Sequence, residues 1–592
     1  MSIFFLVAGS IAILVAIFAD RLGLAGSSGW GSGRLALLFI GLIAYGVSAV
    51  SYLAKKYLTR SASRQAASRV RSYLDRFQQI ILSPLTGLVF GILVCIAIAV
   101  YALWYSSAGR FPAFPEFGND TIQLGESFLH GQLSLLEQPA PELKALSNPY
   151  DYLQRANIPY HWDASYYGGK YYLYWGPVPA LVFAAAEGLT HAPPLASVMV
   201  DLAYMGLGFV LLAIFFMVSR HYFPDGSSLS TGLFLLMALV NLPFLFLLGN
   251  PQIYHTSIIY GQLFLFLGLL GWVIYIVTGR SAGLITAGLG WGLAIGSRVN
   301  LAVSVVIYLV FALIWVVRGS SWKPSLKIVG SLLIPFALCV IGLGAYNFVR
   351  FGDPFETGQK YQLTIPVAHS SYFSLSYIPA NLYIYLFYPI DLVGKFPFVK
   401  SALFDLSRLP GWLIVPPAMS FDHNIFGVFT SIPGLWLVGL VVPLCILAGT
   451  TIRKPGGFQP AFPKWIYFFA MVTVAGLGQF LFLMVFFFGA ERYIPDFYIS
   501  MVLGMAMLVW SMDEFLKPRA RLRLAFWLVV VGLIFFSVAM GFFGGFGVPP
   551  LLFRSFNPAL YGRLTSYWND CYTALFTPLD RASWIIFNMF HY

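Results

Sequence analysis

Apolar runs of about 20 residues recur along almost the whole chain, and they constrain its fold more than any other feature. A helix of that length crosses the roughly 30 Å hydrocarbon core of a bilayer. Hydrophobic residues make up 59% of the 592 residues and charged residues only 10%, whereas a soluble protein carries about 25% charged residues. A β-barrel would instead show alternation over ~10-residue segments. The sequence therefore predicts an all-α polytopic membrane protein.

The runs predict about 13 transmembrane helices. They fall at 3–19, 34–53, 81–105, 195–218, 228–248, 257–278, 284–297, 299–317, 328–349, 424–449, 465–488, 496–512 and 524–545. The seventh and eighth are short and meet at "GSRVN", which fits a broken or re-entrant pair. Residues 177–190 are apolar but too short to span comfortably, and they predict an interfacial helix. Three of the four cysteines lie in apolar runs, which argues against a disulfide framework or a cysteine-based metal site.

The runs also divide the chain into parts. We expect an N-terminal transmembrane hairpin, a basic cytoplasmic linker, a transmembrane core, and a last transmembrane helix followed by an extracytoplasmic tail. These parts cover 1–53, 54–80, 81–512 and 513–592, and the core includes outer loops at 106–194 and 350–423.

Lysine and arginine counts give the expected orientation, because cytoplasmic loops carry an excess of these residues. If residues 54–80 lie in the cytoplasm and each span reverses the direction of the chain, five further loops fall on the cytoplasmic side. The six segments together hold 19 of the 35 basic residues and only 4 of the 23 acidic ones. We therefore expect a multi-pass protein of a bacterial inner membrane, with a cytoplasmic N-terminus and its long polar loops outside the cytoplasm.

This distribution also bears on partners. The net charge of +12 is explained by topology and membrane lipids, so nucleic acid is not an expected partner. No Walker A motif is present, and no G-x-G-x-x-G lies between a strand and a helix. Any chemistry is therefore expected outside the cytoplasm, without a nucleotide cofactor.

The segment after the third predicted span, "FPEFGNDTIQLGESFLHGQLSL", predicts an amphipathic helix on the outer interface. Apolar residues recur near one helical face, as in helices that lie in the plane of a membrane. That face carries Ile122, Gly125, Leu129, Leu133 and Leu136. Asp120 starts the helix. A purely structural role for Asp120 is that of an N-cap, in a loose capping box with Gln123. The pattern alone favours this structural role over a catalytic one.

The stretch "WDASYYGGKYYLYWGPVPAL", residues 162–181, places Lys170 between a Gly-Gly turn and a run of aromatic residues. Aromatic residues at a bilayer interface are ordinary belt residues, and a lysine there can simply extend toward headgroups. The alternative is that a cation and tyrosine hydroxyls gather an anionic lipid head. The tyrosines concerned include Tyr167, Tyr171 and Tyr172.

Three arginines stand at the predicted outer ends of spans: Arg298, Arg350 and Arg492. Each fits an interfacial anchor. Arg298 is the strongest functional candidate, because it joins two short apolar segments and an ionisable residue at that depth is a functional hypothesis. Arginine also suits bidentate phosphate binding. Arg492 can instead pair locally with Glu491 or Asp496.

Two further outward residues are weaker candidates. Asp163 is a carboxylate within the aromatic stretch, and His255 lies at the entrance of a span. A lone histidine there is more often a hydrogen-bonding interfacial residue than a ligand. The sequence suggests no metal cluster.

Together these segments resemble the GT-C superfamily of polytopic glycosyltransferases, in particular the branch of protein O-mannosyltransferases and lipid A aminoarabinose transferases. The likeness rests on "NDTIQLGESFLHGQLSL" and "YYGGKYYLYWGPVPAL", and on "GSRVNLA", "FGDPFETGQKYQL" and "RYIPDF". It covers roughly residues 81–512. Two departures stand out: Asp120 has no acidic neighbour, and Lys170 is not directly followed by prolines.

The resemblance implies an inverting glycosyltransferase that moves a sugar from a polyprenyl-phosphate donor to a hydroxyl of a glycan, lipid or protein acceptor. It implies Asp120 as the catalytic base and Lys170, Arg298 and Arg492 as ligands of the donor phosphate. The substrate-binding residues implied are Asp163, Tyr167, Tyr171, Tyr172, Tyr361 and His255. No cofactor is required by these residues; relatives differ in metal dependence, so a divalent cation is allowed.

Three other functions stay open. The first is a transporter or flippase of a lipid-linked glycan, which would be expected to show repeated halves and charges near the membrane midplane. The second is an O-antigen ligase-like enzyme acting on a pyrophosphate donor. The third is a noncatalytic scaffold, which does not need Arg298 between short spans.

Overall fold

The computed structural model describes most of the chain beyond residue 83. The residues described are 84–111, 113–224, 226, 229–319, 322–364, 371–439, 441–442, 464–547 and 551–589. The expected N-terminal hairpin, 1–53, and the basic linker, 54–80, lie outside them.

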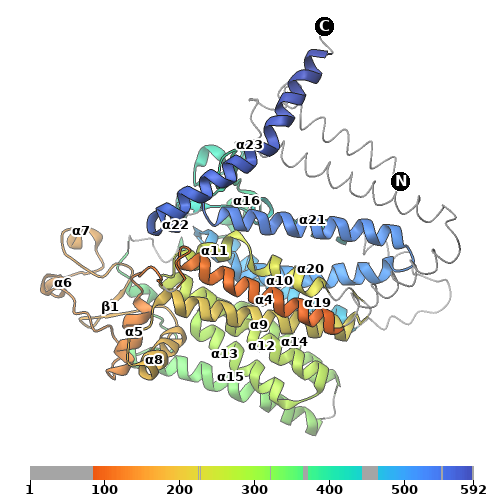
Figure 1. Cartoon of the computed structure of the whole chain (residues 1–592). Coiled ribbons are helices and arrows are strands. Elements are labelled where there is room, and N and C mark those ends of the chain that lie inside the picture. Colours follow the sequence, from red (N-terminus) through yellow and green to blue (C-terminus); the bar gives the residue numbers. More distant parts are fainter. Residues whose placement is uncertain are drawn as a thin grey trace.

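A bundle of long apolar helices forms the body of the protein (Figure 1). Within the described ranges, eight helices are long and apolar enough to cross a membrane, or nine if one bent pair counts as a span. The expected 13 spans are therefore not confirmed. The long helices are α4 (Pro84–Ser106), α9 (Ala196–Tyr222), α12 (Ile253–Thr278), α14 (Ala302–Gly319), α15 (Trp322–Phe351), α19 (Lys464–Met484), α20 (Pro495–Leu516) and α21 (Ala520–Gly544).

The bent pair is α10 (Ser230–Leu239) and α11 (Leu242–Gly249), whose axes differ by 52°. It occupies the predicted span 228–248. The break has a local cause: the Asn241 side chain accepts a hydrogen bond from Phe244 N and caps α11. Pro243 then occupies the first turn of α11, where a missing N–H costs nothing.

The predicted joint at "GSRVN" is present. Helix α13 (Ser281–Ser297) ends there, Arg298 is extended with φ −151°, and a 3-10 turn, η1 (Val299–Leu301), leads into α14. Helix α13 lies against α12 at glycine contacts: a Cβ on Gly290 would lie 2.4 Å from the nitrogen of Gly268. Small residues of this kind let helix backbones approach closely.

The predicted span at 424–449 does not begin as one helix. Its described part forms strand β7 (Asn424–Ile425), helix α17 (Val428–Ser431) and a 3-10 turn, η6 (Pro433–Trp436). Pro433 lacks the N–H that a continuing helix needs. Residues 443–449 lie outside the described part.

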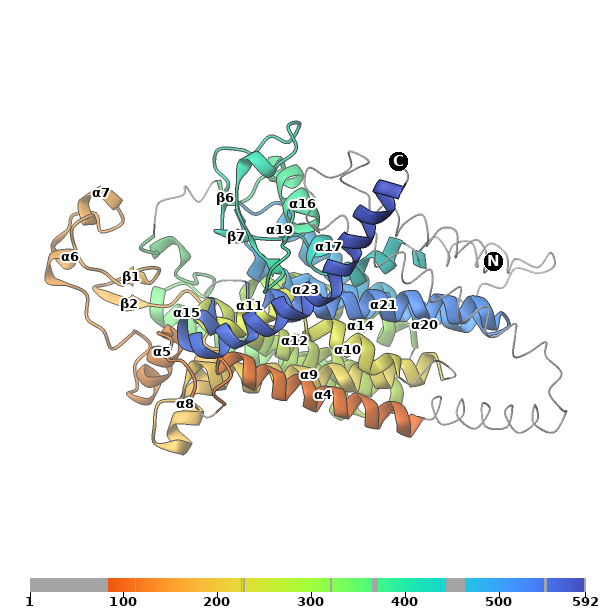
Figure 2. The same cartoon turned by 45° about the horizontal axis from the view of Figure 1, so that its top comes forward.

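The loop after α4 forms most of one end of the bundle (Figures 1 and 2). It contains α5 (Asp120–Leu129), α6 (Pro141–Ala145), α7 (Tyr152–Arg155), β1 (Ser165–Tyr167), β2 (Lys170–Tyr172) and α8 (Val178–Thr190). We call this end, where α4 finishes and α9 begins, the site end. The predicted helices at 120 and at 177–190 both form.

Helix α5 differs from its prediction in length and face. It ends at Leu129, before Leu133 and Leu136, and Leu129 is exposed. Its buried residues are Thr121, Leu124, Gly125 and Ser127. Gly125 faces α8, where a Cβ would lie 3.0 Å from Ala180 O. The orientation of α5 is therefore determined by its packing against α8.

The later loops add short strands and one long helix. Strands pair as β1–β2, β3–β4, β5–β7 and β6–β8, and only the last pair is parallel. Their bounds are β3 (Asp391–Leu392), β4 (Val399–Lys400), β5 (Ala402–Leu403), β6 (Ser420–Phe421) and β8 (Phe488–Gly489). Helix α16 (Ile378–Phe387) precedes β3, and α22 (Leu552–Phe556) and α23 (Pro558–Met589) form the C-terminal segment. The sequence predicted only a tail there.

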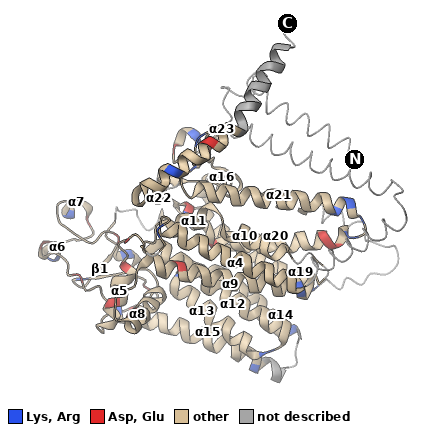
Figure 3. Cartoon of the chain, viewed as in Figure 1, with Lys and Arg blue, Asp and Glu red and all other residues tan. Residues whose placement is uncertain are grey.

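Charged residues lie mainly at helix ends and in loops (Figure 3), as the sequence led us to expect. Three aspartates near the ends of long helices are buried: Asp201 in α9, and Asp496 and Asp513 in α20. Asp513 pairs with Arg523, at 2.5 Å, where α20 turns into α21. Asp201 accepts a hydrogen bond from Ser106 Oγ at 2.5 Å and links α9 to α4.

Candidate functional site

Asn119, and not Asp120, caps helix α5. The Asn119 side-chain oxygen accepts from Thr121 N at 2.8 Å. Its amide nitrogen donates to Pro251 O at 2.6 Å and to Thr256 Oγ1 at 2.9 Å, at the start of α12. The capping role considered for Asp120 is therefore corrected. The cap fastens α5 to α12 and leaves the neighbouring carboxylate for other contacts.

Asp120 instead pairs with a histidine that the sequence analysis missed. His161 Nε2 lies 3.2 Å from Asp120 Oδ1, and His161 Nδ1 lies 2.7 Å from Glu137 Oε2. The hydrogen bond that His161 donates to Asp120, with a further one to Glu137, outweighs burial and raises the pKa of His161 to about 9. Asp120 keeps a quarter of its side-chain surface exposed, so its carboxylate is reachable.

Lys170 lies at the tip of the β1–β2 hairpin. Gly168 and Gly169 make the turn with φ of 56° and 72°, the left-handed geometry that suits a two-residue hairpin. Tyr167 lies opposite Lys170 in the register, and the lysine is exposed. The side chain of Lys170 forms no hydrogen bond or ion pair with any other described residue.

The predicted tyrosines divide into two groups. Tyr167, Tyr172 and Tyr361 surround Phe351, with ring centroids between 5.3 and 5.6 Å from it. Tyr171 is buried and lies by His161, whose backbone N–H donates to its hydroxyl at 3.3 Å. Tyr171 therefore belongs to the surroundings of Asp120, whereas the other three form an aromatic cluster farther along the hairpin.

Asp163 is held by three side chains. Tyr254 Oη and Gln362 Nε2 both donate to its carboxylate, and Tyr174 Oη donates at 3.1 Å. Burial raises the pKa of Asp163, while these hydrogen bonds and the charge of Arg492 act in the opposite direction. The backbone has φ +66° at this residue, which costs a non-glycine residue of order 1 kcal/mol or more.

Arg492 lies beside a cavity at the site end. It forms an ion pair with Asp422, and its guanidinium lies 4.9 Å from the ring centre of Tyr254 and 5.4 Å from that of Tyr493. Its Nε is buried and has no partner among the described residues. The cavity measures about 270 Å³. It is lined by Phe246, Asn250, Gln252, Tyr254, His255, Asp422, His423, Asn424 and Arg492.

The local partners considered for Arg492 are both wrong. Asp496 pairs with Arg298, and Glu491 has two buried carboxylate oxygens with no hydrogen bond in the described structure. Burial raises the pKa of Glu491 well above its ordinary value. Burial therefore favours the neutral form of Glu491, and the carboxylate that pairs with Arg492 comes from 70 residues away.

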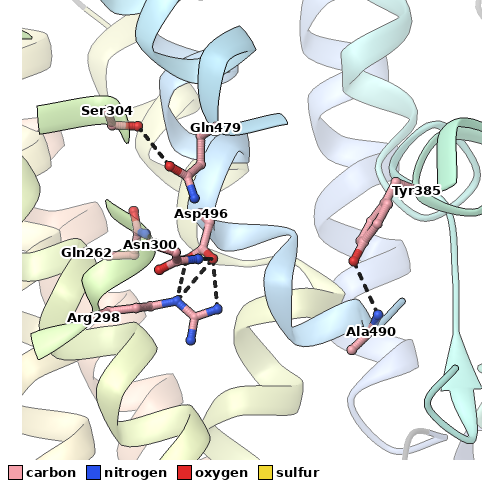
Figure 4. Close-up of polar contacts among 8 residues, drawn as sticks. All are labelled: Gln262, Arg298, Asn300, Ser304, Tyr385, Gln479, Ala490 and Asp496. Atoms are coloured by element: carbon pink, nitrogen blue, oxygen red, sulfur yellow. Dashed lines mark hydrogen bonds and ion pairs between the residues drawn. The ribbon is translucent and has the colours of Figure 1, made fainter. Parts of the chain in front are cut away.

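Arg298 lies in a buried polar network inside the bundle (Figure 4). Its Nη2 lies 2.8 Å from Asp496 Oδ2 and its Nε 3.1 Å from Oδ1. Asn300 and Gln262 also donate to this carboxylate, at 2.9 and 3.3 Å. The Arg298 guanidinium lies 5.2 Å from the ring centre of Tyr493. The ring of Tyr493 therefore contacts both Arg298 and Arg492.

His255 lines the same cavity. Its Nδ1 bonds to Asn250 O, and its ring lies edge-on against Phe246 with centroids 5.1 Å apart. The interfacial hydrogen-bonding role weighed for this residue matches these contacts. Its remaining edge borders the cavity.

A second, larger cavity of about 540 Å³ lies between α5, α8, α13 and α15. Its lining is mainly apolar and rich in glycine. It is formed by Phe128, Gly131, Gln132, Leu133, Pro177, Val178, Leu181, Gly292, Leu293, Gly296, Cys339, Gly342, Leu343 and Tyr346. Beside it Gly176 crosses α13, and a Cβ on Gly176 would lie 2.0 Å from Gly296 O.

The structure therefore brings some of the predicted residues together. Arg492 and His255 border one cavity, Asp163 joins them through Tyr254, and Arg298 joins them through Tyr493. Asp120 is connected through its neighbour Asn119, which binds the same first turn of α12. Lys170 and the Phe351 tyrosines are outside this group.

Sequence reasoning missed His161, Glu137, Tyr254, Asp422 and Tyr493. Only His161 had a usable signal, because it lies two residues before Asp163 in a polar, aromatic stretch. The others become relevant through contacts between distant segments. Among the described residues, no group of three or more His, Cys, Asp and Glu side chains is arranged to hold a metal ion.

Comparisons with known proteins add little. No family model matches the sequence, and no curated protein matches it. It is similar to the crystal structure of the Archaeoglobus fulgidus oligosaccharyltransferase in its apo form, with 14% identity and a TM-score of 0.43. The alignment covers 78% of this chain and 56% of that one, so this chain spans little more than half of that enzyme's length. A likeness of this size assigns the chain to no family.

Proposed function

We propose that this chain is an inverting glycosyltransferase that moves a sugar from a polyprenyl-phosphate donor to an acceptor hydroxyl at the outer face of a bacterial inner membrane. One observation supports the proposal: Asp120, a partly exposed carboxylate, directly follows Asn119, which is hydrogen-bonded to Thr256 in the first turn of α12, and the guanidinium of Arg492 lies over Tyr254 of the same turn. A base and a phosphate-binding cation are the two groups that such a displacement needs.

In this reaction Asp120 accepts the proton of the acceptor hydroxyl. The acceptor oxygen then forms a bond to the anomeric carbon as the bond from that carbon to the phosphate oxygen breaks. The electron pair of the broken bond leaves with the polyprenyl phosphate, and the configuration inverts. Arg492 stabilises the charge that develops on the phosphate, because a preorganised cation in a dry site does so most effectively.

The other predicted residues take supporting places in this proposal. Asp163 and His255 would contact the sugar beside the cavity, and Arg298 would hold Tyr493 and Arg492 in place or reach the phosphate with its outer nitrogen. Lys170 would approach the donor from the exposed tip of the hairpin, whereas the buried Tyr171 would support His161 beside Asp120. Tyr167, Tyr172 and Tyr361 would offer an aromatic surface to the acceptor.

A lipid-linked donor also fits the second cavity. That cavity is apolar and opens beside α15, a helix with little of its apolar surface buried inside the bundle. A polyprenyl chain is apolar and would gain free energy by filling such a space. A soluble sugar nucleotide would gain nothing there.

The test is Asp120→Asn in the full chain, reconstituted in lipid nanodiscs with a polyprenyl-monophosphate sugar. We expect sugar transfer to fall by at least about 100-fold, since a positioned base contributes that much or more, while the melting temperature stays close to that of the wild type. Asp151→Asn is the matched control, because Asp151 caps α7 in the same loop. Unchanged transfer by Asp120→Asn would overturn the proposal.

The flippase alternative is favoured by one observation, the buried Arg298–Asp496 pair with Gln262 among apolar helices. Vesicles separate the two functions. A flippase would move a lipid-linked glycan across the bilayer without forming a new glycoside, whether Asp120 is present or not. Transfer from a pyrophosphate-linked donor alone would instead indicate a ligase-like enzyme.

A further inference from the structure

His161 lies between two carboxylates that come from different segments. Asp120 opens α5, and Glu137 lies in the connection between α5 and α6. The two nitrogens of one imidazole therefore face two acceptors, at 3.2 Å and 2.7 Å. His161 is mostly buried, with 13% of its side chain exposed, whereas Glu137 is 47% exposed.

The remaining surroundings of His161 fix its backbone. The hydroxyl of Tyr171 accepts from its N–H at 3.3 Å, and the two rings lie 5.8 Å apart. Asp120, Glu137 and Tyr171 are the titratable groups that face the imidazole. Because both carboxylates favour the charged ring, the pKa of His161 lies near 9, and the ring is an imidazolium at neutral pH.

We infer that Glu137 and His161 act as positioning residues for Asp120. We call the three side chains the carboxylate clamp. Glu137 holds the ring, the ring holds Asp120 Oδ1, and Asp120 Oδ2 remains for the acceptor hydroxyl; no hydrogen bond from a described residue occupies it. The inference rests on the proposed function, which makes Asp120 the base.

The clamp needs the charged form of histidine. An imidazolium donates from both nitrogens, whereas a neutral imidazole donates from one and presents a lone pair at the other. When His161 loses a proton, one of its two hydrogen bonds is lost, and the nitrogen lone pair then faces a carboxylate and repels it. A histidine whose pKa is raised on folding keeps this stabilisation below its ordinary pKa and loses it as the pH rises through about 9. The clamp therefore opens on the alkaline side.

The first experiment measures the proton on His161 directly. The chain contains 8 histidines, so NMR of histidine-labelled protein in nanodiscs can follow them, and the spectrum of His161→Gln identifies the signal of interest. We expect a midpoint near pH 9 in the wild type and a midpoint lower by about one pH unit in Glu137→Gln. A wild-type midpoint near 6.5, or no shift in Glu137→Gln, would overturn the clamp.

The second experiment measures sugar transfer against pH. In Glu137→Gln we expect the alkaline fall of kcat to move to lower pH by about the same interval, so that the loss of kcat relative to the wild type is larger at about pH 8 than at about pH 6. A purely structural role would lower kcat equally at every pH, and that outcome would overturn the positioning role. Glu142→Gln is the matched control, because Glu142 is an exposed carboxylate in the neighbouring α6.

The two proposals fail separately. If Glu137→Gln shifts the titration of His161 but leaves the pH profile of kcat unchanged, the positioning role is wrong and the proposed glycosyltransferase activity still stands. Undiminished transfer by Asp120→Asn would remove the base, and with it the clamp's function, whatever the NMR midpoint is.

Discussion

At the scale of single residues, Arg492 has the surroundings expected of a phosphate ligand. Three aromatic rings lie within 5.4 Å of its guanidinium carbon, and one carboxylate, Asp422, balances its charge. Rings support a cation without neutralising it, and the buried Nε has no hydrogen-bond partner in the described part of the chain. An arriving phosphate would therefore find a dry guanidinium with donor capacity left.

This predicts that charge alone will not suffice at this position. Arg492→Lys keeps the charge but loses the planar fork that binds phosphate oxygens in pairs. We expect kcat/KM for the lipid-linked donor to fall by at least about 100-fold, measured by transfer of a radiolabelled sugar.

The control is Arg408→Lys, at an exposed arginine that pairs with Asp391 at 2.8 Å. It should leave kcat/KM within about twofold of the wild type, because exposed ion pairs contribute little. Equal effects of the two changes would contradict a phosphate-binding role for Arg492.

The same residues show which parts of the site can be predicted from the sequence. The apolar runs and the sidedness of charge drew attention to Asp120, Arg298 and Arg492. Their partners stayed hidden, because Arg298 meets Asp496 across 198 positions and Arg492 meets Asp422 across 70. Local spacing suggested Glu491 instead, and only the packing shows that its carboxylate oxygens are buried with no hydrogen-bond partner among the described residues.

At the scale of elements, predictions succeed where hydropathy has a clear period or length. Helices α4, α9, α12 and α19 to α21 lie close to their predicted ranges. The C-terminal helix α23 was missed because its residues are mixed rather than continuously apolar. In the segment at 424–449 the described residues do not form one continuous helix, because Gly427 and Pro433 interrupt its apolar run, and helix resumes only at 437.

Helix α15 supplies a prediction about the second cavity. Gly342 lines that cavity, and a Cβ there meets no atom within 4 Å. The side chain of Gly342→Phe would therefore start in open space at the cavity wall. We expect KM for the polyprenyl-phosphate sugar to rise by at least about tenfold, a loss of roughly 1.4 kcal/mol of binding, while kcat at saturating donor changes little.

Gly330→Phe makes the same exchange on the same helix away from the cavity and should leave KM unchanged. Melting temperatures of both variants show whether the fold is retained. A Gly342→Phe protein with wild-type KM would mean that the lipid chain lies elsewhere.

At the scale of the whole molecule, the proposed reaction depends on which side of the membrane the site end faces. Cys571 reports on this, because it is exposed on α23, in the segment expected outside the cytoplasm. We predict that a membrane-impermeant maleimide labels Cys571 in intact spheroplasts, and that Cys571→Ser abolishes this labelling.

Arg280 provides the opposite reference, since it is exposed in the turn between α12 and α13 and is expected in the cytoplasm. Arg280→Cys in the Cys571→Ser protein should be labelled only after the membrane is permeabilised. The reverse pattern would put the site end in the cytoplasm and remove the basis for a polyprenyl-phosphate donor outside.

The crossing of Gly176 over Gly296 sets a limit on how this protein can diverge. Two main chains touch there with no side chain between them, one residue from Ser297 and two from Arg298. Neighbouring positions can trade one side chain for another, but a Cβ at 176 would overlap the backbone of Gly296 and push the hairpin loop away from α13. In a saturation library, position 176 should accept almost no replacement, even if the tyrosines around it prove permissive.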